Sequence, residues 1–346
     1  MAARPRISLH SMRLFRFGSR IAMAIVAAAL CGAAVRGESA PADAIHAAAW
    51  HALMEGRVQD AETALRQMIA SNPSDAYAHQ LLCRTFYSQE MYDAAVAECQ
   101  AAAGSATASR EEASDTQLWL GRAYGMKAQR AGPIAGFKLA RKVQASFAQA
   151  VDLNPNNVAA LNDLGEYDVD APFIVGGGLD KAQLLADRMM PRFPAAAHRL
   201  LARMANSEND LPSAETEFKR AIAVGGAAEA WIDLAQFYEA RKRPDDAVTA
   251  VRSTVAADHS HGPALVDAAS ILIAIHRAPD LAERCLRDYL ASRTKTDAAP
   301  AFKAHLQLGR LLAARGNSDE AEREADAAAA LAPGYSRSKR AVQQGM

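Results

Sequence analysis

Arginine recurs at a fixed place in this sequence, and its planar guanidinium group is well suited to binding carboxylates. When the chain is divided into units of about 34 residues, the ninth position is arginine in four of eight units. This pattern predicts a row of arginines that binds an acidic segment or a C-terminal carboxylate of another protein. The full candidate set, including polar and aromatic residues expected on the same face, is Trp50, Tyr77, Gln80, Arg84, Tyr87, Arg122, Arg199, Arg203 and Arg310.

The alternative for these arginines is a solvated helix face balanced by acids of the same chain, which is the commoner situation for surface cations. Glu166 occupies the ninth position of the fourth unit and interrupts the row. The sign of the ligand therefore stays open at this point.

Cysteine offers a second candidate chemistry. Cys83 and Cys99 fall at positions eight and twenty-four of one unit, levels that two antiparallel helices would bring together. A disulfide is feasible there in an oxidising compartment, and two buried thiols are the alternative. Cys285 has no evident partner, and no Cys-x-x-Cys motif occurs, so the sequence predicts neither a zinc site nor a redox motif.

A glycine-rich segment lies between Asp170 and Asp180. Gly176, Gly177 and Gly178 precede a helix start, where successive backbone N–H groups can bind an anion. The sequence lacks the rest of a nucleotide-binding P-loop, and a sharply turned connection is the simpler interpretation. Phe173, Ile174 and Val175 precede the glycines; we expect them to pack back on the fold, with contact to a partner as the alternative.

No constellation typical of catalysis is found. The motifs of serine hydrolases, zinc proteases and dinucleotide-binding enzymes do not occur in the sequence. His259 and His261 are close in sequence but have no accompanying carboxylate–histidine cluster. The sequence therefore predicts a protein that is not an enzyme and has no cofactor and no metal.

The elements that would position these residues form a repeat. The most regular unit, Ala228–His261, has two helical segments separated by a break at Arg243-Pro244-Asp245. The eighth position of every unit is small: Ala49, Cys83, Gly121, Gly165, Ala202, Ala235, Ser270 and Gly309. The twentieth position is alanine in seven units: Ala61, Ala95, Ala182, Ala214, Ala247, Ala282 and Ala321. Small residues at both positions would let two antiparallel helices approach closely, and stacked units would bury the apolar faces that remain.

The unit Trp231-x-x-Leu234-Ala235-x-x-Tyr238, followed by Ala247, resembles the tetratricopeptide repeat. Leu120-Gly121-x-x-Tyr124 and Leu308-Gly309-x-x-Leu312 are similar to it. The resemblance covers residues 42–335 and implies an all-α fold, a right-handed superhelical solenoid of about eight antiparallel helix pairs. It also implies a concave groove that binds peptides or protein surfaces.

Two units are longer than the others. In the third, we expect an inserted loop around Ala128–Phe137, and in the fourth the glycine-rich segment is the insertion. Both connect the first helix of a unit to its second. They should therefore emerge side by side on one edge of the solenoid.

The N-terminal segment has the features of an export signal. Arg13, Arg16 and Arg20 precede the apolar run Ile21–Val35, whose 15 residues are too few to span a bilayer easily. We therefore expect residues 1–37 to be a signal peptide, with cleavage at a point up to about residue 42; Met12 would also serve as a start. Residues 336–346 would form a C-terminal cap or tail.

Charge and composition limit the kinds of partner that this protein could bind. Without residues 1–37, which hold six arginines and no acid, the chain carries 33 basic against 39 acidic residues, an argument against general nucleic-acid binding. We expect an exported, periplasmic or secreted scaffold that binds another protein or peptide in its groove. The alternatives are an assembly subunit of cell-envelope or polysaccharide machinery, which implies a membrane-associated complex, and more remotely a ligand-binding protein that uses the two insertions.

Overall fold

Helices make up the described part of the chain. The computed structural model describes residues 44–105 and 108–335, and no strand occurs among them. The predicted signal peptide (1–37) and C-terminal tail (336–346) lie outside these residues. The elements are α2 (Ala44–Met54), α3 (Val58–Ser71), α4 (Ala76–Ser88), α5 (Tyr92–Ala103), α6 (Arg110–Gln129), α7 (Pro133–Leu153), α8 (Val158–Asp170), the 3-10 helix η1 (Phe173–Val175), α9 (Leu179–Met189), α10 (Pro194–Ser207), α11 (Leu211–Gly225), α12 (Ala228–Ala240), α13 (Pro244–Ala257), α14 (Ala264–Ala274), α15 (Pro279–Ala291), α16 (Ala301–Ala314) and α17 (Ser318–Leu331).

Consecutive helices pair, from α2 with α3 to α16 with α17, which gives eight helix pairs in the described chain. The first helices begin close to the unit starts expected from the sequence. The prediction of an all-α solenoid of about eight helix pairs is therefore confirmed. The prediction of an inserted loop around Ala128–Phe137 is wrong. Helix α6 ends at Gln129 and α7 begins at Pro133, so the extra residues lengthen both helices.

Close helix approach explains the small residues of the repeat. A Cβ atom added at Gly121 would lie 2.4 Å from a ring carbon of Phe147, which is too close for any side chain. The alanines at the twentieth position are buried in six of the seven units that carry one, and Ala321 is half-buried. A larger side chain at these positions would force the paired helices apart.

Polar residues define where several first helices begin. The side-chain oxygens of Asp75 and Asn157 accept hydrogen bonds from the backbone N–H groups of Ala78 and Ala160, at 2.9 and 3.1 Å. At α6, Ser109 and Glu112 accept from one another's backbone N–H groups and form a capping box. These side chains satisfy N–H groups that have no partner within the helix.

A histidine–glutamate pair joins the two helices in three of the repeats, and in each the partners are 19 residues apart. The Nδ1 to Oε2 distances are 2.6 Å for His79–Glu98, 2.7 Å for His198–Glu217 and 2.6 Å for His305–Glu324. All three pairs are partly buried. The recurrence shows that polar as well as apolar contacts follow the repeat.

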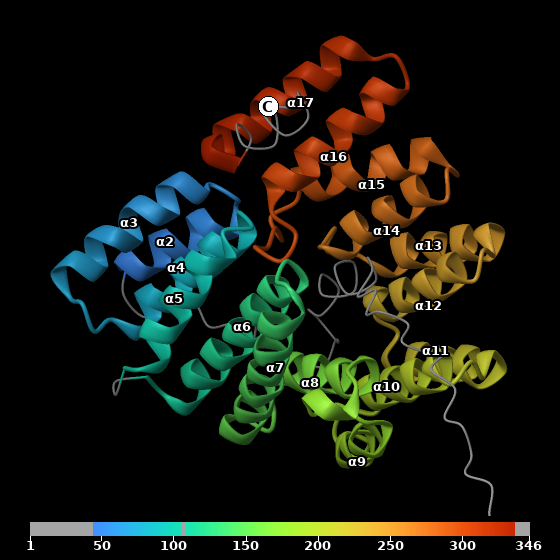
Figure 1. Cartoon of the computed structure of the whole chain (residues 1–346). Helices are drawn as coiled ribbons and strands as arrows, with labels where there is room; N and C mark the ends of the chain where they lie inside the picture. Colours follow the sequence, from blue (N-terminus) through green and yellow to red (C-terminus); the bar gives the residue numbers. More distant parts are fainter. Residues whose placement is uncertain (1–43, 106–107, 336–346) are drawn as a thin grey trace, which may run out of the picture.

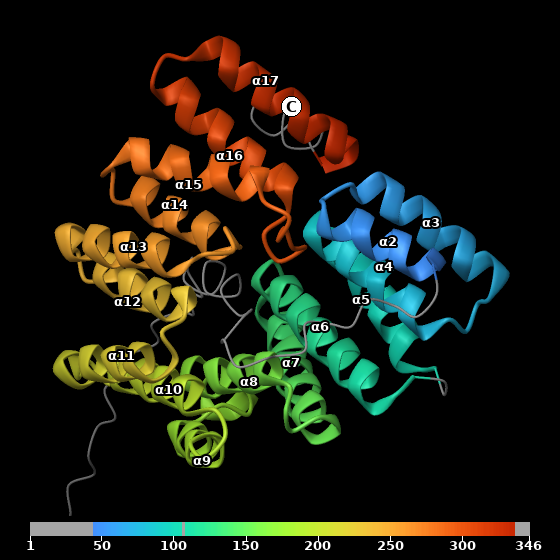
Figure 2. The same cartoon turned by 180° about the vertical axis from the view of Figure 1, so that it is seen from behind.

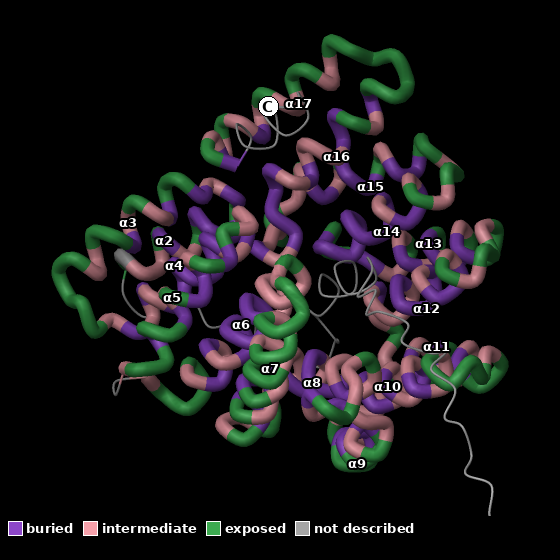
Figure 3. The backbone as a smooth tube through the Cα atoms, viewed as in Figure 1, coloured by how far each residue is buried: buried purple, intermediate pink, exposed green. Residues whose placement is uncertain are grey.

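The eight pairs are arranged in a ring that brings the two ends of the described chain together (Figures 1 and 2). In Figure 1 the first helix of a pair lies nearer the centre than the second, most clearly for α14 with α15 and α16 with α17. Successive first helices from α2 to α14 also contact one another, so they form a continuous inner layer. Figure 3 shows buried residues concentrated in this layer and exposed residues on outer helices such as α3 and α17.

The ends of the solenoid are joined by an apolar cluster. Val58, at the start of α3, packs with Phe302 of α16, with Ala328 and Ala332 at the end of α17, and with Tyr335. The backbones of the first and last repeats also pack closely here, because a Cβ atom added at Gly56 would lie 3.1 Å from the backbone nitrogen of Ala301. The last repeat thus covers an apolar surface that the first repeat would otherwise expose.

Polar contacts reinforce this closure. The hydroxyl of Tyr335 donates a hydrogen bond of 2.8 Å to Oε1 of Glu90, and Nζ of Lys303 lies 3.3 Å from the same oxygen. Deeper in the ring, Nε and Nη2 of Arg84 donate to the two carboxylate oxygens of Asp297, at 2.7 and 2.9 Å. Both side chains are buried, and 213 residues separate them in sequence.

We expect Asp297→Ala to lower the free energy of unfolding by about 3–5 kcal/mol, because it removes a carboxylate that compensates a buried guanidinium. Equilibrium unfolding in urea measures this loss. Replacing both partners, as Arg84→Met with Asp297→Leu, should restore part of it.

Glu62→Ala is the control, since the pair of Glu62 with Arg66 on α3 is more exposed. Its loss should stay within about 0.5 kcal/mol. Equal losses for Asp297→Ala and Glu62→Ala would show that closure does not depend on the buried pair.

Candidate functional site

The inner layer holds most of the arginines predicted from the sequence. Arg84 of α4 and Arg122 of α6 both stack on the ring of Trp119, with guanidinium carbons 4.9 and 4.7 Å from the ring centroid. Tyr87 packs edge-on against the same ring at 5.3 Å. Trp119 therefore holds the two guanidinium planes in place through its face.

Arg122 has a carboxylate partner in the next repeat. Its Nε and Nη2 atoms donate to the two oxygens of Asp163 on α8, at 2.6 and 3.3 Å. Burial opposes the charge of Arg122, but the field and hydrogen bond of Asp163 together hold its pKa above the ordinary value. The ion pair thus stays charged inside the protein.

Arg199 and Arg203 of α10 have carboxylate partners as well. Nε of Arg199 lies 2.7 Å from Asp233 of α12, and its Nη2 donates to Glu166 of α8 at 3.3 Å. Arg203 lies 3.4 Å from Glu166 and 3.6 Å from Asp170. Burial raises the pKa of Glu166, although Arg203 and Arg199 oppose the rise.

These contacts correct the interpretation of a row of arginines that awaits an external carboxylate. Arg84, Arg122, Arg199 and Arg203 each already have a carboxylate of the same chain within 3.6 Å. Glu166, which seemed to interrupt the row, is the carboxylate that two of them share. The alternative of intramolecular balance describes this layer.

The other predicted groove residues are dispersed. Trp50 packs edge-on against His51 at 4.9 Å, and Tyr77 against His46 at 5.3 Å. Gln80 is buried on α4. Arg310 is exposed on α16, where its charge acts on Tyr335 at the closure. The structure thus brings together Arg84, Tyr87 and Arg122 in one group and Arg199 with Arg203 in another.

On α12 and α14, the carboxylates of the inner layer outnumber the arginines. Burial raises the pKa of Asp267 on α14 to about 7, with Asp233 and Glu229 adding to the rise and Arg199 opposing it. Burial also raises the pKa of Glu229, at the start of α12, to about 7, and Asp258 and Asp233 contribute. Asp267 is buried, whereas Glu229 is partly exposed. We call Glu229, Asp233 and Asp267 the carboxylate cluster; Arg199 is the cation that acts on all three.

Sequence reasoning missed the acidic members of this layer. The sixth position of a unit is acidic at Asp163 and Asp233, and each carboxylate contacts an arginine of the preceding unit. A comparison of the sixth position of one unit with the basic positions of the unit before it would have revealed these pairs. Asp297 carries no such signal, because it lies in the connection between α15 and α16.

The two insertions lie side by side, as expected. The hydroxyl of Tyr167 donates to the carbonyl oxygens of Ala140 on α7 and Val175 in η1, at 2.8 and 2.9 Å. The expectation that this segment packs back is confirmed for Val175, which is buried, and is wrong for Phe173 and Ile174, which are 80% and 61% exposed. The 3-10 turn directs the first two side chains outward because its third residue fills the space beside α7.

The three glycines form a sharply turned connection. A Cβ atom at Gly177 would lie 2.0 Å from the carbonyl oxygen of Ala171, so only glycine fits there. Gly176 and Gly178 have φ angles of 101° and 150°, a region that other residues rarely adopt. The N–H of Gly178 donates to the carbonyl of Asp168 and closes the turn at 2.8 Å. The glycines are therefore explained by backbone geometry.

Comparison with known families agrees with this geometry. Two family models of the tetratricopeptide repeat match the sequence, one over residues 52–116 and the other over residues 207–261. These two segments of the chain are tetratricopeptide repeats. Comparison with curated proteins found no match.

Several solved structures are similar to this chain. They include a thermophilic tetratricopeptide-repeat protein from Thermus thermophilus, with 18% identity, coverage of 63% of this chain and 92% of that chain, and a TM-score of 0.41. A tetratricopeptide-repeat protein from Parabacteroides merdae has 12% identity, coverage of 77% and 99%, and a TM-score of 0.41. Yeast Tom70 has 11% identity, coverage of 84% and 85%, and a TM-score of 0.37.

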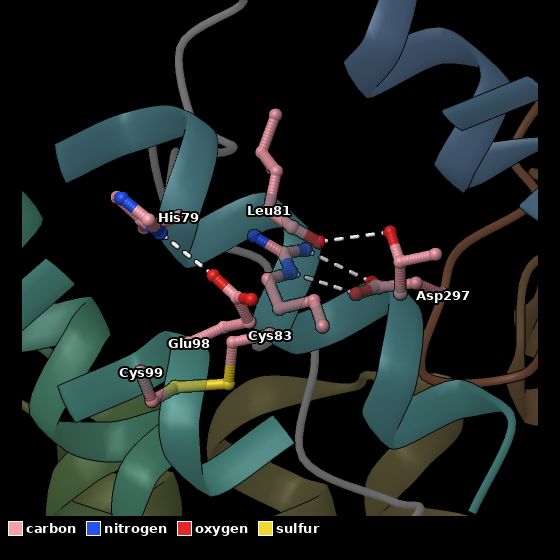
Figure 4. The surroundings of a disulfide bond; sticks show 8 residues. His79, Leu81, Cys83, Glu98, Cys99 and Asp297 are labelled. Atoms are coloured by element: carbon pink, nitrogen blue, oxygen red, sulfur yellow. Dashed lines mark hydrogen bonds and ion pairs between the residues drawn. A yellow bond between two sulfur atoms is a disulfide. The ribbon is translucent and has the colours of Figure 1, made fainter. Parts of the chain in front are cut away.

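Cys83 and Cys99 form a disulfide that joins α4 to α5 within the second repeat. Figure 4 shows the bond near Asp297 and beside the pair of His79 with Glu98. Cys285 is the remaining cysteine of the described chain; its thiol is buried, and burial raises its pKa to about 12. The disulfide fixes the helix that carries Arg84, the neighbour of Cys83 in sequence.

Within residues 44–105 and 108–335, no three His, Cys, Asp or Glu side chains are placed to hold a metal ion together. Among the helices of that same part, none has the length and apolar character needed to cross a membrane.

We expect the double variant Cys83→Ala with Cys99→Ala to lower the free energy of unfolding by about 3 kcal/mol, as for other loops of this length closed by a disulfide. Urea unfolding of the oxidised protein measures the loss. Reductant should destabilise the wild type but leave the double variant unchanged, and Cys285→Ala should keep the sensitivity to reductant. Equal stability of the oxidised and reduced wild type would contradict the prediction.

We expect Asp267→Asn to raise the free energy of unfolding by about 1–3 kcal/mol at pH 8, because it removes a buried negative charge. The folded-state pKa of about 7 lies above that of the unfolded chain, so wild-type stability falls as pH rises through this range. At pH 5 the wild-type carboxyl is protonated in the folded state but still ionised in the unfolded chain, so the advantage of the variant should be smaller than at pH 8 and should vanish only below about pH 4. Thermal unfolding at both pH values tests this, and a difference that did not change with pH would contradict it.

Proposed function

We propose that this protein is an exported, non-enzymatic scaffold of the cell envelope that binds a partner protein through the inner layer of its repeats. The tetratricopeptide repeats support the general role, since stacked helix pairs present extended surfaces for protein contact. The surplus of carboxylates at α12 and α14 is the observation that carries the specific proposal.

The cluster favours a basic group on the partner. Arg199 lies 2.7 Å from Asp233, whereas burial, together with neighbouring carboxylates, raises the pKa values of Asp267 and Glu229 to about 7. A lysine, an arginine or an N-terminal amine brought into the cluster would stabilise the ionised carboxylates. Glu229 is partly exposed and offers the point of entry. The proposed ligand is thus a basic segment, the opposite sign from the one that the arginines alone indicated.

Export is supported by two independent features. The basic residues and short apolar run within residues 1–37 match a secretory signal. The disulfide between Cys83 and Cys99 suits an oxidising compartment, because disulfides are rare in proteins that stay in a reducing cytosol. We therefore place the scaffold in the periplasm or outside the cell.

Capture from envelope extract at pH 8 tests the scaffold role. We expect Glu229→Gln with Asp267→Asn to reduce recovery of the partner about tenfold or more, because two charge-assisted contacts are lost. Thermal unfolding should show that the variant is at least as stable as the wild type at this pH, so that lost capture does not reflect unfolding.

Glu322→Gln with Asp326→Asn on α17 removes two exposed carboxylates outside the cluster and serves as the matched control. Its capture should equal that of the wild type. Full capture by the cluster variant would exclude this cluster as the binding site, and no specific capture by the wild type would contradict the scaffold proposal itself.

A further inference from the structure

The third and fourth repeats share an edge that differs from the rest of the ring. We define the docking edge as residues 127–142, at the turn between α6 and α7, together with η1. α6 and α7 have 20 and 21 residues, against 13 and 14 in α12 and α13. The extra residues extend this helix pair by about 10 Å at 1.5 Å per residue. The docking edge therefore projects beyond the neighbouring pairs.

Large apolar side chains are exposed on both parts of the docking edge. Ile134 is 78% and Phe137 40% exposed on α7, and Phe173 and Ile174 of η1 are exposed as described above. Single exposed apolar residues are common on protein surfaces, but here four come from two adjacent insertions. They lie at the surface of α7 and η1, where they can enter an apolar phase outside the protein.

The same edge is rich in cations. Residues 127–142 contain five lysines and arginines and no aspartate or glutamate, in a chain whose net charge is zero. Lys138, Arg141 and Lys142 are exposed on α7. Ile134, Lys138 and Arg141 follow helical spacing along one face and, with Phe137, line an open depression there. Cations thus stand immediately beside the exposed apolar groups.

Nearby acids neutralise only part of this charge. Lys127 pairs with Asp93, and Arg130 pairs with Glu90 at 3.1 Å, both at the inner end of the docking edge. On the side of η1, Asp170 lies 3.6 Å from Arg203, and the carboxylate of Asp180 lies beside Gly178. The cations farther along α7 keep the edge positive.

We propose that the docking edge binds the surface of a membrane that contains anionic lipids. Ile134, Phe137, Phe173 and Ile174 would enter the boundary between headgroups and acyl chains, while Lys138, Arg141 and Lys142 contact lipid phosphates. This combination of projecting apolar groups and adjacent cations is how proteins bind membrane interfaces without crossing them. An acidic protein surface would use the cations but would offer the four exposed apolar groups no apolar contact.

Flotation with lipid vesicles tests the proposal, with the full chain of every variant as isolated from the expressing cells. The probes are phosphatidylcholine vesicles with and without phosphatidylglycerol. The wild type should float with the anionic vesicles, and salt should weaken its binding. Lys138→Glu with Arg141→Glu, and separately Ile134→Ser with Phe173→Ser, should each reduce binding about tenfold or more. Since residues 1–37 are the same in all variants, differences between them report on the docking edge.

Two controls match these changes. Arg252→Glu with Arg323→Glu alters the net charge equally at exposed positions on α13 and α17. Val224→Ser removes an exposed apolar group from the end of α11, at the opposite edge of the ring from the docking edge. Both should bind like the wild type, and circular dichroism should show that all variants keep their helices.

Equal flotation of the docking-edge variants and their controls would overturn the proposal. Equal binding of the wild type to vesicles with and without phosphatidylglycerol would also overturn it. Loss of vesicle binding without loss of partner capture would separate this edge from the carboxylate cluster. Protein capture that depends on Lys138 and Arg141, with no vesicle binding, would assign the edge to an acidic protein partner instead and would also overturn the membrane proposal.

Discussion

A solenoid of helix pairs leaves an apolar surface at each end, and this protein covers part of that surface by bringing its ends together. Val58 and Phe302 belong to the first and last repeats, yet they share one apolar cluster. The stacking of neighbouring repeats is a local interaction, whereas this contact is set by the curvature summed over the whole chain. Each repeat must therefore hold its angle to the next for the ends to meet, which makes the ring sensitive to changes far from the closure.

The ion pairs of the inner layer follow from the same constraint. Closing the ring brings Asp297 to Arg84 and buries both, and a buried guanidinium needs a carboxylate to offset its desolvation. The desolvation of Arg122 is offset by Asp163, and that of Arg199 by Asp233. Each carboxylate comes from the next repeat. Because the pairs have fixed geometry, they specify the register between repeats. Such register control is the best-attested role of buried polar contacts, even where their net contribution to stability is small.

The sequence predicted the repeated helix pairs but not the contacts that close the ring. The small residues at the eighth and twentieth positions were enough to place eight helix pairs, because helix packing depends on local spacing. The partner of Arg84 could not be predicted, since it lies 213 residues away in an irregular connection. Phe173, Ile174 and Val175 were expected to pack inward because they are hydrophobic, but in this 3-10 turn only Val175 is buried. Where a side chain depends on the shape of one particular turn, residue type alone does not decide its direction.

Although the net charge of the chain is zero, basic and acidic residues are concentrated in different repeats of the ring. Residues 127–142 contain five lysines and arginines and no aspartate or glutamate, whereas Glu229, Asp233 and Asp267 of α12 and α14 form an acidic cluster. Exposed charges are screened within about 10 Å at moderate salt, so two regions on different repeats can act on different partners without cancelling one another. The rigid inner layer between them fixes their relative orientation. A membrane bound at the docking edge would therefore present the carboxylate cluster at a constant height and angle, which is what a scaffold on a lipid surface must do to position a second protein.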